Sequence, residues 1–191
     1  MRAATRTVTL ALLFVSGGCL VALHMVRGDL DPIARRLSEY ATGPYSFVMA
    51  AVFYATGLAL LTLSAQVAGA GSAGVIRLAA ALIALAGAGL VLSGVFRTGT
   101  DSMLVEIVHS RASGTSVIAL TAAAALTSIH PAFDGLRRWD TAARLLTAVV
   151  VVAVVVSPIL HATRWAGLSQ RVVWFSLAAW LLMTAWHMPT D

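Results

Sequence analysis

Long apolar stretches alternate with short charged segments along the 191-residue chain. The first stretch lies between Arg6 and Arg27, and five further stretches of similar or greater length follow it. A helix that rises 1.5 Å per residue needs roughly 20 apolar residues to cross a hydrocarbon core about 30 Å thick. The alternation of apolar and polar residues that is typical of a membrane β-barrel is missing. The pattern therefore predicts six transmembrane helices, near residues 7–26, 46–67, 76–96, 107–129, 143–163 and 170–188.

The composition excludes a water-soluble helical bundle. The chain is 59% hydrophobic and 11% charged, with a mean hydropathy of +0.88, whereas soluble domains carry about 25% charged residues. The predicted helices are apolar on all sides and would offer water no polar face. The net charge of +5 is spread over short loops, so we expect no nucleic-acid partner. We predict an all-α integral membrane protein in which residues 1–191 form one six-helix transmembrane domain.

The longest polar stretch, residues 27–44, connects the first two predicted spans. Within it, Asp31 can cap a helix whose first residue is Pro32. Gly43 and Pro44 break the chain before the second span. We therefore predict a short interfacial helix over residues 32–40, lying at the membrane surface.

Arginines are shared almost equally between the two sides of the predicted bundle, so their number alone does not fix the orientation. Arg2 and Arg6 directly precede the first span, which often determines the topology. We therefore predict a multi-pass protein of the plasma membrane with both termini in the cytoplasm.

Most carboxylates and three of the five histidines lie in or beside the first, third and fifth loops, which share one side of the membrane. In the fourth span Glu106, His109, Ser113 and Ser116 follow one helical face, with spacings of three, four and three. Such a polar face should point into the bundle, because contact with lipid is costly. Glu106 and His109 could be a structural pair, an acid–base group or, as a Glu-x-x-His motif, metal ligands.

Other polar residues at this end could complete a site. Two carboxylates and a histidine at a membrane surface could perform acid–base chemistry, and arginines could hold an anionic headgroup. No serine elbow, phosphate-binding loop, dinucleotide fingerprint or CxxC motif is present, so we expect no cofactor and assign no metal site. The predicted catalytic residues are His109, Glu39, Glu106 and Asp101, and the predicted ligand contacts are Arg97, Arg111, His161, Arg164, Arg171 and Tyr40.

Three segments together resemble a known family. They are Leu37-Ser38-Glu39-Tyr40 before the second span, Gly89 to Thr98 followed by Asp101 and His109, and Gly167-Leu168-Ser169-Gln170-Arg171 at the start of the last span, which contains Trp180. The chain resembles the six-helix membrane family called domain of unknown function 998 and, more distantly, DRAM/FRAG-type membrane proteins. The resemblance implies six helices and draws attention to Glu39, Asp101, His109 and Arg171. It implies no activity.

Three functional hypotheses are compatible with these features. The first is the binding or processing of a lipid-like or isoprenoid molecule at a polar site on the non-cytoplasmic end, with membrane lipid as the partner. Whether such a protein is an enzyme stays open. The alternative is a non-catalytic accessory subunit of a membrane complex or a homo-oligomer, and the second alternative is a transporter or channel.

Overall fold

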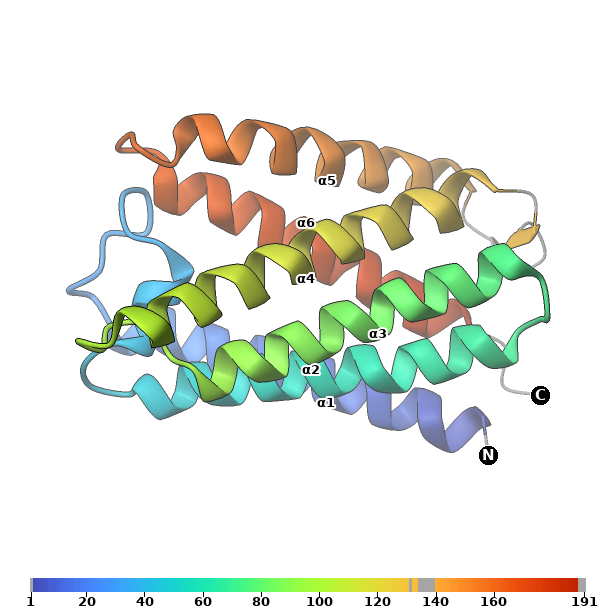
Figure 1. Ribbon diagram of the computed structural model, residues 1–191, viewed down its shortest axis with the longest axis horizontal. Coiled ribbons are helices and arrows are strands. Elements are labelled where there is room, and N and C mark those ends of the chain that lie inside the picture. The colour runs from blue at the N-terminus through green and yellow to red at the C-terminus, as the bar shows by residue number, and fades with distance from the viewer. Residues whose placement is uncertain (1, 131, 134–139, 189–191) are drawn as a thin grey trace.

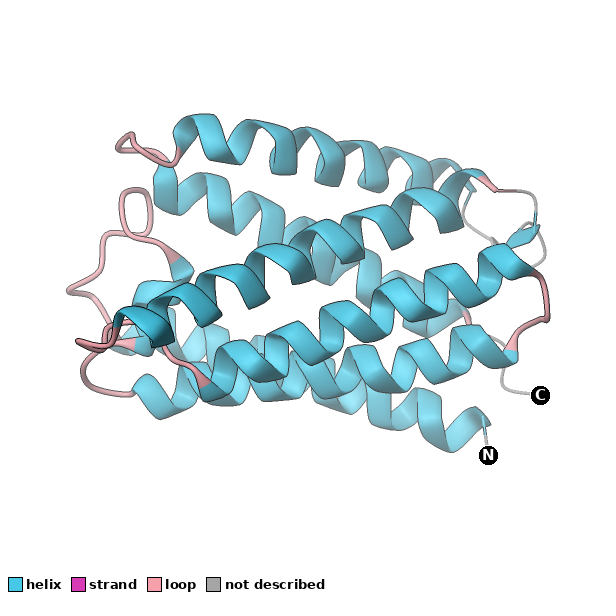
Figure 2. Ribbon diagram, viewed as in Figure 1, coloured by secondary structure: helices cyan, strands magenta, loops and turns pink. Residues whose placement is uncertain are grey.

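The computed structural model describes residues 2–130, 132–133 and 140–188, and these form a bundle of long helices that run roughly side by side (Figure 1). The described parts are helices and loops (Figure 2). Six of the helices are long and apolar enough to cross a membrane, which confirms the predicted fold class. The elements are α1 (Arg2–Val26), η1 (Leu37–Ala41), α2 (Ser46–Gly69), α3 (Gly74–Val95), α4 (Met103–Ile129), α5 (Asp140–Leu160) and α6 (Ala166–His187).

The helix bounds differ from the prediction at the start of α1, which begins at Arg2 instead of residue 7, and around the third and fifth loops. Helix α4 starts at Met103, about one turn before the predicted residue 107, because the Ser102 side chain caps it by accepting from the Val105 amide. Helix α5 ends at Leu160, two residues after Pro158, and α6 starts at Ala166 instead of residue 170. The connection between α5 and α6 is therefore a short turn over residues 161–165.

Helices α1 to α4 pack in chain order, and close backbone approach holds α2 against α3. A Cβ on Gly57 would lie 2.8 Å from the Gly87 carbonyl oxygen, and a Cβ on Gly87 would lie 2.8 Å from that of Gly57. Ser64 adds a 2.7 Å hydrogen bond to the Ala80 carbonyl. Small residues suit such crossings because lipid provides no hydrophobic force between helices.

Helix α5 lies at the edge of the bundle, where it packs beside α6 and α4 (Figure 1). Only 11% of its most apolar window is buried, compared with 56% for α2. Helix α6 returns to α1, where the Arg6 guanidinium lies 5.5 Å from the centre of the Trp186 ring. The chain thus builds a well-packed side from α1 to α4 and an open edge at α5.

The first loop differs from the prediction of a helix over residues 32–40. Residues 32–34 form a turn, and a 3₁₀ helix, η1, follows over Leu37–Ala41. Leu37 and Tyr40 are only 1% exposed, so η1 packs into the end of the bundle instead of lying along the membrane surface. The reason is a long-range contact, because the Leu37 amide donates to the Gln170 side chain of α6 at 2.7 Å.

Candidate functional site

The first, third and fifth loops gather at one end of the bundle, opposite the start of α1 and the end of α6 (Figure 1). These loops are residues 27–45, 96–102 and 161–165. These loops and the adjoining helix ends carry most of the predicted site residues. This arrangement follows from the six consecutive spans and agrees with the predicted polar end.

His109 of α4 is only 4% exposed and faces the end of α3. Its Nδ1 lies 2.8 Å from the Phe96 carbonyl oxygen and 3.1 Å from that of Ser93. Because carbonyls only accept hydrogen bonds, Nδ1 carries a proton and donates to the last turn of α3. The ring also meets Phe53 edge to face, with 5.6 Å between centroids. The imidazole therefore caps α3 and fixes its packing against α4.

Glu106 binds the loop that follows the same helix end. Its carboxylate accepts from the Thr98 hydroxyl at 2.7 Å and from the Gly99 amide. Gly99 has a φ of +84°, a conformation that favours glycine. Glu106 and His109 thus bind two points of loop 96–102. This structural role is sufficient to explain their spacing of three residues.

The two serines on the same face of α4 bond mainly to their own helix. Ser113 donates to the His109 carbonyl and Ser116 to the Ala112 carbonyl, each at 2.8 Å. Ser116 and His109 are buried, as predicted for a polar face that points into the bundle. Within the described parts of the chain, no hydrogen bond or ion pair joins His109 to Glu39, Glu106 or Asp101. Their catalytic roles stay predictions.

Arg171 and Tyr40 do come together, and His24 joins them. Arg171 is 5% exposed and lies in the second turn of α6. Its guanidinium donates to the Tyr40 hydroxyl at 3.2 Å and to His24 Nε2 at 3.0 Å. Three backbone carbonyls accept from its Nη1, those of Pro32 (2.7 Å), Arg35 (2.6 Å) and Gly167 (3.1 Å).

Arg27 holds the two ends of the first loop together. It forms a two-pronged pair with Asp29, with both N–O distances at 2.8 Å, and donates to the Thr42 and Pro44 carbonyls. These hydrogen bonds lower the pKa of the Asp29 carboxyl and raise the pKa of Arg27. Neither Arg27 nor His24 was among the site residues predicted from the sequence. Their only signal was their place at the end of the first span, beside the polar loop.

The other predicted residues lie nearer to water. Glu39 accepts from Arg35 at 3.3 Å and from the Arg36 amide at 2.9 Å, and Arg97 donates to Ser46 at 3.4 Å. No group of three potential metal ligands occurs in the described residues. Exposed positions are occupied by Asp101, Arg111, His161 and Arg164.

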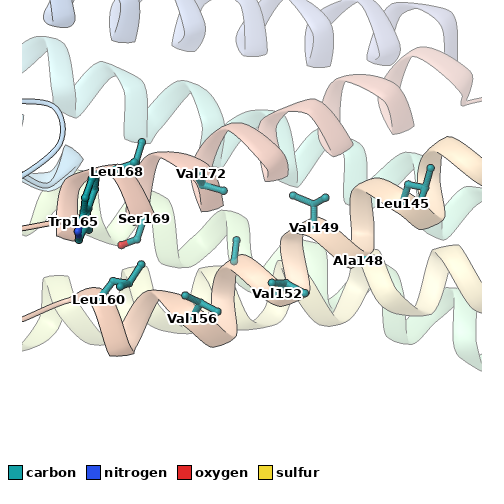
Figure 3. Close-up of a pocket in the computed structure, with 11 residues that line it drawn as sticks. Leu145, Ala148, Val149, Val152, Val156, Leu160, Trp165, Leu168, Ser169 and Val172 are labelled. Carbon is teal, nitrogen blue, oxygen red and sulfur yellow. The ribbon is translucent and has the colours of Figure 1, made fainter. Parts of the chain in front are cut away.

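An apolar groove of about 580 Å³ lies between α5 and α6 (Figure 3). Trp165 lies at one end of it, beside Leu160, and Arg164 covers the indole ring at 5.1 Å. Ser169 supplies a hydroxyl, which donates to the Ala166 carbonyl at 2.9 Å. The lining residues are Leu145, Ala148, Val149, Val152, Ala153, Val156, Leu160, Trp165, Leu168, Ser169 and Val172.

Six apolar helices with polar loops at their ends define a multi-pass membrane protein. Over residues 8–187 the chain matches the family described as "Protein of unknown function (DUF998)", and it belongs to that family. This confirms the resemblance seen in the sequence. No curated protein and no solved structure matches the chain. The likeness to DRAM/FRAG-type proteins, the plasma-membrane location and the cytoplasmic termini stay predictions.

Proposed function

We propose that this protein binds a membrane lipid, with an apolar chain in the groove between α5 and α6 and an anionic headgroup beside residues 161–165. The groove is the observation that carries the proposal. Its volume of about 580 Å³ lies within the range of ligand pockets, roughly 300–1,000 Å³. Its lining is almost entirely aliphatic, which suits a hydrocarbon chain.

The length and direction of the groove support a lipid chain. Leu145 and Leu160 line its two ends and lie 15 residues apart on α5, about 22 Å along the helix axis. Half of a hydrocarbon core is about 15 Å thick. A chain that enters beside Trp165 can therefore extend through its whole leaflet while it stays in contact with both helices.

The charge at the Trp165 end favours an anionic headgroup. His161 and Arg164 lie exposed on the five-residue connection, and Trp165 is a residue type that anchors helices at the headgroup level. Among the residues that the structure describes, neither His161 nor Arg164 forms an ion pair with a carboxylate. An arginine near the membrane surface contributes about 1 kcal/mol to the binding free energy of an anionic lipid.

The same geometry supports binding and not turnover. Ser169 donates to a backbone carbonyl and lies 3.4 Å from the Ser157 hydroxyl. No imidazole or carboxylate among the described residues forms a hydrogen bond with either hydroxyl, so no base is in place to activate them. We therefore propose that the protein binds lipid, and we favour binding over enzymatic processing.

Native mass spectrometry of the detergent-purified protein tests this proposal with two added lipids, phosphatidylglycerol and phosphatidylcholine. Val152→Phe fills the groove, whereas Val155→Phe adds the same ring to an outward position of the same helix. Both valines are well exposed, at 61% and 65%, so the two variants are matched in burial. We expect Val152→Phe to lose most of the bound lipid and Val155→Phe to retain it.

The headgroup is tested by Arg164→Gln, with Arg111→Gln as the matched control at another exposed arginine. We expect Arg164→Gln to reduce the preference for phosphatidylglycerol over phosphatidylcholine about fivefold. Equal lipid binding by both valine variants would contradict the groove as the site and would favour the accessory-subunit hypothesis.

A further inference from the structure

The cluster around Arg171 contains a buried cation that no carboxylate neutralises within the described residues. Arg171 is 5% exposed, and its hydrogen-bond partners are neutral groups: His24, Tyr40 and three backbone carbonyls. A buried charge is tolerated only when its hydrogen bonds are satisfied. The stability of this cluster therefore depends on each of those acceptors remaining an acceptor.

His24 can accept from Arg171 in only one protonation state. Its Nδ1 lies 2.8 Å from the Leu20 carbonyl oxygen, one turn earlier in α1, and must donate to it. Its Nε2 lies 3.0 Å from Arg171 Nε, which always carries a proton, and must accept. Only the neutral imidazole with its proton on Nδ1 satisfies both contacts.

The hydrogen bonds of Arg171 connect separate parts of the chain. Its guanidinium holds the carbonyls of Pro32 and Arg35 and the hydroxyl of Tyr40, all in the first loop, against α6. Two further contacts follow the same seam, from the Leu168 amide to the Ile33 carbonyl at 3.0 Å and from the Leu37 amide to Gln170. Arg171 is the central connection between the first loop and the start of α6.

We propose that the first loop is a pH-sensitive clasp, in which protonation of His24 releases residues 30–42 from the start of α6. A proton on His24 Nε2 would place two N–H donors 3.0 Å apart and would bring a positively charged imidazole next to the Arg171 guanidinium. The two positive charges would repel each other. His24 is only half-buried, so protons can reach it. The proposal is independent of lipid binding.

Among the described residues, no carboxylate forms a hydrogen bond or an ion pair with His24. Arg171 faces it from α6, and Tyr40 faces it from η1 with 5.1 Å between ring centroids. The nearest carboxylates in sequence are already engaged. Asp29 is paired with Arg27, Glu39 is bonded to Arg35 and Arg36, and Asp31 accepts from the Ile33 amide.

Hydrogen exchange of the full-length protein in lipid nanodiscs tests the clasp at pH 7.5 and pH 5.5, after correction for the intrinsic exchange rate. Histidine is the side chain whose charge ordinarily changes within this pH window, so acid acts on the clasp through His24. We expect a roughly tenfold loss of protection in residues 30–42 on acidification. Ordinary carboxyl groups titrate below this window.

Variants of His24 separate the clasp from other effects of acid. Gln can accept from Arg171 but does not titrate, so His24→Gln should keep its protection at pH 5.5. His24→Lys carries a permanent charge and should be open at both pH values. His130→Gln, at an exposed histidine of the opposite end, should behave like the wild type. Equal loss of protection in His24→Gln and wild type, or none in wild type, would overturn the proposal.

Imidazole nitrogen NMR of the wild-type protein gives a second test, should the His24 variants fail to fold. The signals of His24 can be assigned by removing the other four histidines one at a time. We expect a neutral ring with its proton on Nδ1 at pH 7.5, the form that the contacts with Leu20 and Arg171 require. A ring with its proton on Nε2 at pH 7.5 would overturn the proposal.

Discussion

The first two turns of α6 have two faces with opposite chemistry. One face, with Gly167, Gln170 and Arg171, binds the first loop through hydrogen bonds that satisfy its polar groups. The other face, with Leu168 and Val172, lines an apolar groove that the chain itself does not fill. In water, exposure of the second face would destabilise the protein. In a bilayer, lipid covers this face at little cost in free energy.

This difference indicates how the fold divides its tasks. Polar groups near a membrane must be satisfied by the protein wherever water does not reach them, so the loop side is built from specific, long-range hydrogen bonds. The groove side needs only shape and apolar side chains, so it can remain open and receive a mobile lipid. Variants of Arg171, Gly167 and Asp29 test the loop side of this division, from the largest expected effect to the smallest.

Replacing Arg171 should disrupt the loop side most strongly. Arg171→Leu leaves Tyr40 and two loop carbonyls without their donor, and we expect a loss of about 3 kcal/mol in the free energy of unfolding. Lys cannot reproduce the branched guanidinium, so Arg171→Lys should recover only part of the loss. Arg111→Leu, at an exposed arginine, is the control and should change little. The measurement is reversible unfolding in mixed micelles, and equal stability of the two leucine variants would show that the cluster stabilises nothing.

Much of the fold could be predicted from the sequence, but the structure of the first loop could not. The six spans were predictable because charged residues such as Arg6, Arg27 and Arg77 delimit them, and the buried side of α4 followed from the spacing of Glu106 and His109. The fold of the first loop was not predictable, because its partners Gln170 and Arg171 lie more than 130 residues away in sequence.

The groove could not be predicted from the sequence either. The residues that line it, such as Val152 and Val156, are of the same type as their lipid-facing neighbour Val155. Periodicity cannot separate these positions in a helix that is apolar on all sides. Only the placement of α5 beside α6 distinguishes a groove from ordinary lipid-facing surface.

Gly167 lets the first loop lie directly against α6, and a methyl group there should separate them. A Cβ at this position would approach the carbonyl oxygens of Pro32 (2.7 Å) and Ile33 (2.8 Å), both of them backbone atoms that cannot rotate away. We expect Gly167→Ala to destabilise the protein by about 2 kcal/mol and to increase hydrogen exchange in the first loop. Gly114→Ala, where the Cβ meets nothing within 4 Å, is the matched helix control and should be neutral or slightly stabilising. Identical exchange in both variants would mean that the loop has room to move.

Asp29 should make the smallest contribution, and one that depends on pH. Hydrogen bonds from Arg27 hold the pKa of the Asp29 carboxyl below its usual value of 3.8. Because the pKa is lower in the folded state, the stabilising contribution is present above pH 3.8 and is lost as the pH falls through the folded value. The stability difference between wild type and Asp29→Asn should therefore shrink when unfolding is measured from pH 6 down to pH 3. Asp101→Asn, at an exposed carboxylate that forms no ion pair with another described residue, is the control, and its stability should run parallel to that of the wild type. A constant difference for Asp29→Asn would mean that Arg27 holds the loop through the Thr42 and Pro44 carbonyls alone.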